Sequence, residues 1–134
     1  MIIENIINNI TEILLLAFLI ITFLQSGFDK ILDWKGNVSW LKEHFSKTFM
    51  KNMVPFNVAL IMVIEIIAGV LCLLGIYQLI ANNDKGLALY GAVLSCIALL
   101  MLLFGQRVAK DYDGARTIAI YFIPAVFAVF LLSF

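Results

Sequence analysis

Four long apolar runs limit what this chain can fold into more than any other feature. In chain order they cover residues 6–31, 56–81, 87–104 and 117–134. Each run has about the length, 17–25 residues, that an α-helix needs to cross a hydrocarbon core of roughly 30 Å. Of the 134 residues, 63% are hydrophobic and 13% are charged, whereas a soluble domain has about twice that charged fraction. The sequence therefore predicts an all-α, multi-pass membrane protein.

The short connections at residues 81–86 and 105–116 make neighbouring helices antiparallel, so we expect an up-down bundle of four transmembrane helices. Both termini then lie on one side. Eight of the nine Lys and Arg residues fall on the opposite side, and Lys85 is the exception. By the positive-inside rule, the first and third connections are cytoplasmic and both termini are outside the cytoplasm.

The N-terminal segment, MIIENIINNITE, has two acids and no Lys or Arg, unlike a secretory signal, so we expect it to be retained. Its isoleucines recur at helical spacing, which predicts one long helix running from these polar turns into the first apolar run.

The first connection carries an amphipathic pattern. It predicts a helix over about residues 38–52, lying along the membrane surface between the first two spans and flanked by Trp34 and Trp40. His44 lies within it, and a single exposed histidine is usually an ordinary surface residue. The apolar positions of the pattern are Val38, Leu41, Phe45 and Phe49.

Several functional classes lack support. A formal net charge of zero argues against a nucleic-acid partner, because such proteins need a basic excess. Cys72 and Cys96 lie in apolar runs without a CxxC or metal-ligand spacing, so we expect small packing residues and no metal site. The sequence has neither a hydrolase nucleophile motif nor a phosphate-binding glycine loop, and it implies no covalent cofactor.

Glu65 is the sharpest single signal. It lies nine residues into the second run, where a charged side chain costs on the order of 2.5–3.5 kcal/mol and usually faces a partner inside the bundle. Its candidate partners are Gln25, Lys30 and Arg107. Two interpretations remain open, a ligand-binding or proton-relay residue and a protonated glutamate that only sets helix register.

Antiparallel helices also bring the other polar residues to the same end of the bundle. Aligning residues 27–36 with 105–115 matches Gly27 with Gly105, Asp33 with Asp111 and Gly36 with Gly114, as expected for duplicated helical hairpins around a polar cavity. The candidate ligand-binding or proton-relay residues are Lys30, Glu65, Arg107, Asp111, Gln25, Asp29, Lys110 and Arg116.

These segments resemble the DoxX family of small four-helix bacterial membrane proteins. The resemblance rests on SGFDK at 26–30, EIIAGVLCLLG at 65–75, and GQRVAKDYDGA at 105–115 leading into YFIP at 121–124. It implies a bacterial inner-membrane subunit or partner of a sulfur or thiol redox system, with a quinone as the compatible cofactor. It also implies that Lys30, Glu65, Arg107 and Asp111 form the polar core.

We therefore expect a DoxX-like membrane subunit with a polar pocket for a quinone-like or lipophilic ligand. Two alternatives remain, a non-catalytic accessory or assembly subunit of a larger membrane complex, and a small transporter. The expected partners are the lipid bilayer and either other membrane subunits or further copies of the chain. Whether the chain catalyses a reaction, and with which residues, stays open.

Overall fold

The computed structural model describes all 134 residues, and its regular elements are all helices. The elements are α1 (Ile2–Asn8), α2 (Ile10–Leu32), α3 (Trp34–His44), the short 3-10 helix η1 (Lys51–Met53), α4 (Val54–Asn82), α5 (Gly86–Val108) and α6 (Tyr112–Leu132). Helices α2, α4, α5 and α6 are long and apolar enough to cross a membrane. The predicted all-α fold with four spans is confirmed.

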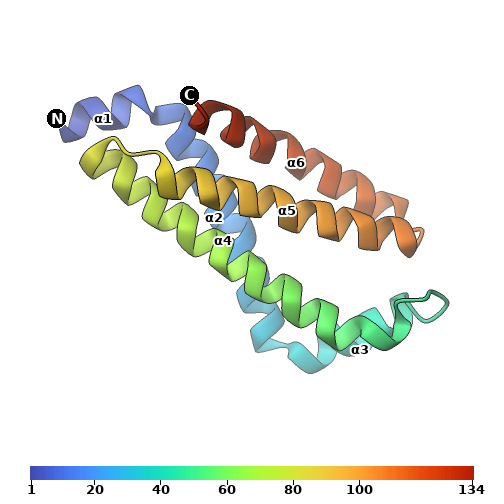
Figure 1. Ribbon diagram of the computed structural model, residues 1–134. Coiled ribbons are helices and arrows are strands. Elements are labelled where there is room, and N and C mark those ends of the chain that lie inside the picture. The colour runs from blue at the N-terminus through green and yellow to red at the C-terminus, as the bar shows by residue number, and fades with distance from the viewer.

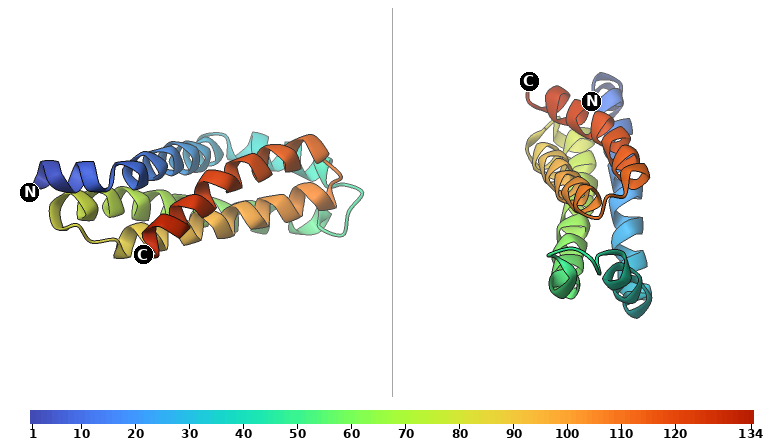
Figure 2. Two further views of the ribbon diagram at one scale, coloured as in Figure 1. Left: turned by 90° about the horizontal axis from the view of Figure 1, so that it is seen from above. Right: turned by 90° about the vertical axis from the view of Figure 1, so that its right-hand side faces the viewer.

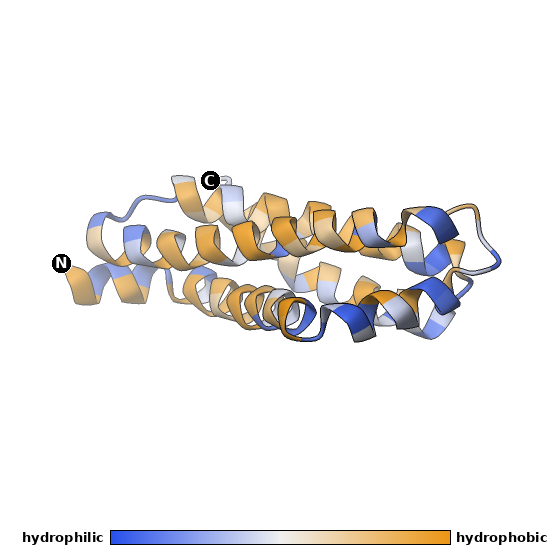
Figure 3. Cartoon of the chain, turned by 90° about the horizontal axis from the view of Figure 1, so that it is seen from below, coloured by the Kyte–Doolittle hydropathy of each residue, from blue (hydrophilic) through white to orange (hydrophobic).

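The four long helices run alternately up and down (Figure 1). Helix α4 packs between α2 and α5, while α6 packs along α5 and also contacts α2. The N- and C-termini lie at one end of the bundle, and α3 lies with the α5–α6 connection at the other (Figure 2). Polar residues gather at this second end, called the α3 end below, whereas the middle of each span is apolar (Figure 3). The sequence predicted this arrangement.

Helices α4 and α5 are close together near their connection and diverge toward the α3 end (Figure 1). Small side chains allow the close approach, because Ala88, Ala92 and Ser95 recur at helical spacing on α5 and are fully buried. A Cβ atom on Gly75 of α4 would lie 2.5 Å from the Cα atom of Ala88. The divergence leaves room between the two helices at the α3 end.

The prediction of one long N-terminal helix is wrong, because the chain breaks at Asn9 into α1 and α2. The Asn9 side chain is buried, and its amide donates to Asn5 O at 2.9 Å and to Asn83 Oδ1 at 2.7 Å. Asn5 in turn donates to Ile80 O at 2.9 Å. These bonds tie α1 to the α4–α5 connection, which explains why the segment turns there.

The amphipathic helix also differs from its prediction. It is α3, which ends at His44, and residues 45–50 form turns before η1, so the helix starts and ends earlier than the predicted 38–52. Its apolar side is used within the protein, because Val38 packs with Val54 and Val58 of α4. Helix α3 therefore covers the divergent end of α4.

Two spans extend four or five residues beyond their apolar runs at one end. Helix α5 continues to Val108, past the predicted residue 104, and α6 begins at Tyr112, before the predicted residue 117. Hydropathy marks the apolar stretch, whereas caps mark helix ends. The Asp111 side chain is such a cap, since its Oδ1 accepts from the backbone N–H of Gly114 at 3.0 Å.

Candidate functional site

An ion pair between α2 and α4 lies at the centre of the candidate site. The Lys30 ammonium nitrogen is 2.9 Å from Glu65 Oε1, and it also donates to Ser26 Oγ at 2.8 Å. Glu65 is 1% exposed and the Lys30 side chain 17%. Oε1 makes no hydrogen bond of regular geometry, so the contact with Lys30 is primarily ionic. Among the three predicted partners of Glu65, the structure selects Lys30.

Close packing of α2 on α4 makes this pair reachable. A Cβ atom on Gly27 would lie 2.7 Å from Ile66, and one on Gly69 would lie 2.6 Å from Leu24. Contacts this short exclude a larger residue unless the neighbouring side chain shifts. The two glycines therefore hold the helices at a spacing that a lysine side chain can bridge.

A cavity of about 560 Å³ opens between the diverging ends of α4 and α5. Its wall is predominantly apolar, with 14 hydrophobic residues among 19. Several wall residues on α5, including Leu100 and Phe104, are more than half exposed, so the cavity is open at the surface of the bundle. The polar side chains in its wall are Lys30, His44, Asn57 and Gln106.

His44 belongs to this site, although the sequence analysis treated it as an ordinary surface residue. Its side chain is 21% exposed, its ring stacks on Trp40 at 4.7 Å between centroids, and its Nε2 lies 3.5 Å from Asp111 Oδ2. The contact joins α3 to the α5–α6 connection across the polar end of the cavity. The sequence shows that His44 follows Leu41 by three residues and so shares a helix face with it, but it does not show that this face packs against α4.

Gln106 is the second residue of the site that is not among the predicted candidates. It lines the cavity, and its Oε1 is buried without a hydrogen-bond partner. His44 Nε2 is also buried without a regular hydrogen bond. Buried polar atoms are nearly always paired in folded proteins. Two such atoms therefore lie at the same cavity, and each could form a hydrogen bond that the protein itself does not supply.

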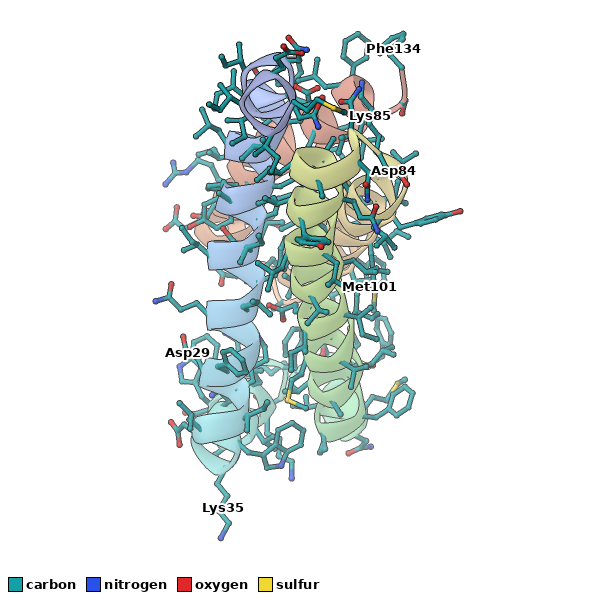
Figure 4. The ribbon with its side chains drawn as sticks, turned by 90° about the vertical axis from the view of Figure 1, so that its left-hand side faces the viewer. Asp29, Lys35, Asp84, Lys85, Met101 and Phe134 are labelled. Atoms are coloured by element: carbon teal, nitrogen blue, oxygen red, sulfur yellow. The ribbon has the colours of Figure 1, made fainter.

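The structure separates five of the eight candidate residues from the cavity. Gln25, Asp29, Arg107, Lys110 and Arg116 are all exposed. Asp29 lies on the outer side of α2, toward the end of the molecule that carries Lys35 (Figure 4). Lys85 lies at the opposite end, and Met101 lies nearer the middle.

The two arginines have surface partners. The guanidinium carbon of Arg107 lies 5.4 Å from the ring centroid of Tyr112, and Arg116 pairs with Asp113 at 3.2 Å. The expectation that Arg107 joins Glu65 in a polar core is therefore wrong. Asp111 reaches the site only through its contact with His44.

The two matched segments form similar corners in the structure. Asp33 directly precedes α3 and Asp111 directly precedes α6. A Cβ atom on Gly36 would lie 2.5 Å from the Asp33 carboxylate, and one on Gly114 would lie 2.7 Å from the Asp111 carboxylate. In both corners, the glycine three residues after the aspartate leaves space for its side chain.

Comparison with known proteins identifies the family. The sequence model of the DoxX family matches residues 13–104, which is more than half of the chain. No curated protein and no solved structure matches the chain. The protein therefore belongs to the DoxX family. The matched region contains Lys30, His44 and Glu65, whereas Asp111 and α6 lie beyond it.

Proposed function

We propose that this DoxX family protein binds a lipophilic ligand with a polar head, of the quinone class, in the α4–α5 cavity, as a membrane subunit of a thiol or sulfur redox system. The cavity itself, with the Lys30 ammonium group in its wall, carries the proposal. Ligand sites typically have volumes of about 300–1,000 Å³ and apolar walls with a few polar groups. The volume and lining of this cavity fit that description.

The residues present suit a quinone. An ammonium group has three protons. Lys30 donates one of them to Ser26, and Glu65 Oε1 lies 2.9 Å from the ammonium nitrogen as its counter-ion. A further proton can donate to a carbonyl oxygen in the cavity. Asn57 also lines the wall, and its side-chain amide offers a further donor. Apolar residues of α5 would hold the ring and tail.

A bound quinone would supply the capacity to accept two electrons and two protons. In this proposal Lys30 orients the carbonyl oxygen and Glu65 holds Lys30 in place. His44, backed by the Asp111 carboxylate at 3.5 Å, is the group able to exchange a proton at the polar end of the cavity. A partner protein would provide the reductant.

The test is photochemical labelling of the protein in nanodiscs with a quinone analogue that carries a photoreactive tail. We expect labelled peptides from α5 around Met101, competition by unlabelled quinone, and loss of labelling in Lys30→Gln. Lys35→Gln, which removes an exposed lysine at the same end, is the control. Labelling that free quinone does not reduce, or equal labelling of both variants, would contradict the proposal.

A second candidate function is docking to a larger membrane complex. The observation that favours it is the exposure of Arg107, Lys110 and Arg116 at one end of the bundle, away from the cavity. Charge reversal at these positions should then abolish co-purification of the partner, while Glu65→Gln should leave it intact. The opposite pattern would assign partner binding to the cavity.

We also propose that the protein lies in a bacterial inner membrane with both termini outside the cytoplasm, which places α3 at the cytoplasmic surface. Lys35 and Lys85 lie at opposite ends of the molecule (Figure 4). A membrane-impermeant maleimide should label Lys85→Cys and spare Lys35→Cys, once the outer membrane is permeable to it. The reverse pattern would invert the orientation.

A further inference from the structure

The distribution of charged groups in the cavity wall restricts the class of ligand more than the shape of the cavity does. Lys30 is the one Lys, Arg, Asp or Glu residue among the 19 that line the cavity. Its counter-ion Glu65 is behind it, almost completely buried between α2 and α4. His44 also lines the cavity, and its partner Asp111, whose side chain is 28% exposed, lies outside the lining. Each basic group in the wall is therefore matched by an acid outside it.

We infer that the cavity selects a ligand whose head is uncharged and carries a hydrogen-bond acceptor, and that Glu65 is the residue that determines this specificity. The inference rests on the proposed function and narrows its ligand class. It excludes fatty-acid anions and the phosphate groups of lipids, which surround the protein in any membrane.

Electrostatics supports this selection from both directions. An anionic head at Lys30 would place a second negative charge beside a carboxylate that is 1% exposed, and like charges repel strongly where water is scarce. A cationic head would meet the ammonium group of Lys30 itself. A neutral acceptor, such as a carbonyl or ester oxygen, uses a further ammonium proton without adding charge.

Removing the Glu65 charge should therefore change the preferred ligand. In Glu65→Gln the ammonium group keeps Ser26 as a partner but loses its counter-ion. It can then pair with an anionic head. A hydrogen bond to a charged group contributes about 1.5–3 kcal/mol, which corresponds to at least a tenfold change in affinity.

The experiment uses three amphiphiles with the same ten-carbon chain, namely methyl decanoate, decanoate and decylammonium. The protein is placed in nanodiscs of zwitterionic lipid. Trp40 lines the cavity and reports binding by its emission in a Trp34→Phe background. We expect methyl decanoate to bind at least about tenfold more tightly than either ion. Glu65→Gln should bind decanoate at least about tenfold more tightly than the background does.

Asp29→Asn is the matched control, because it removes a negative charge next to Lys30 in sequence but on the outer side of α2. It should leave the order of affinities unchanged. The comparison of the three amphiphiles needs no substitution at Glu65, so the inference stays testable even if Glu65→Gln fails to fold.

Three outcomes would overturn the inference. These are decanoate binding to the Trp34→Phe protein as tightly as methyl decanoate, Glu65→Gln gaining no affinity for decanoate, and Asp29→Asn producing the same gain. Failure of every amphiphile to bind would reject both the inference and the proposed cavity. Binding of methyl decanoate without binding of quinones would support the selectivity and reject the quinone assignment alone.

Discussion

Replacing Lys30 with Met tests whether the buried ion pair supports the fold. The change leaves the Glu65 carboxylate 1% exposed and without a cation at 2.9 Å. Removing one partner of a buried pair costs about 3–5 kcal/mol. Because the Lys30 side chain is itself 17% exposed, we expect a loss of unfolding free energy near the lower end, about 3 kcal/mol.

Glu65→Gln should cost less, about 1–2 kcal/mol, since Lys30 keeps Ser26 and can extend toward the membrane surface. A double variant, Lys30→Met with Glu65→Leu, should recover most of the stability, because neither charge remains buried.

The measurement is reversible unfolding by SDS in mixed micelles, followed by tryptophan emission. Lys35→Met is the matched control, because Lys35 is an exposed lysine on α3. A contrary result would be that Lys30→Met loses no more stability than Lys35→Met, or that Glu65→Gln loses more than Lys30→Met. Either result would mean that the pair is not an interacting unit.

Three further predictions concern the packing and the polar ties, all measured by the same unfolding assay. Gly75→Ala places a Cβ 2.5 Å from the backbone of α5 and should cost about 1–3 kcal/mol, whereas Gly86→Ala, with only a side-chain oxygen at 3.3 Å, should be nearly neutral. Asp111→Ala removes the α6 cap and should cost about 1 kcal/mol, while Asp111→Asn preserves it. Asn9→Ala breaks the bonds to the α4–α5 connection and should cost about 1–3 kcal/mol, with the exposed Asn8→Ala as its control. Equal losses in any matched pair would contradict the corresponding assignment.

Hydropathy and connection length were sufficient to predict the four spans and their up-down order, because lipid permits few alternatives to complete helices. The depth of Glu65 in an apolar run was likewise sufficient to predict an internal partner. Hydropathy and the depth of a residue in its apolar run can both be counted along one helix. Neither hydropathy nor depth depends on how the helix is rotated about its axis.

The choice among neighbouring polar residues depends on that rotation, and there the prediction was wrong. Gln106 and Arg107 are adjacent on α5, yet Gln106 lines the cavity and Arg107 lies outside over Tyr112. Selecting residues by charge favoured Arg107, whereas a confined apolar space accepts the neutral amide more readily. His44 was missed for a related reason, because its position became informative only once α3 was known to pack against α4.

The position of the cavity corresponds to a change in side-chain size along α5, from small residues near the α4–α5 connection to large ones toward the α3 end. This change can be read directly from the sequence. Near the α4–α5 connection the buried residues are Ala88, Gly91, Ala92 and Ser95. A Cβ on Gly91 would lie 2.8 Å from the backbone of α4, which shows how closely the helices approach there. Toward the α3 end the α5 residues that line the cavity are large, including Ile97, Met101 and Phe104. Small buried residues let the two helices approach closely at one end, and large side chains line the space between them at the other, where the cavity lies beside Lys30.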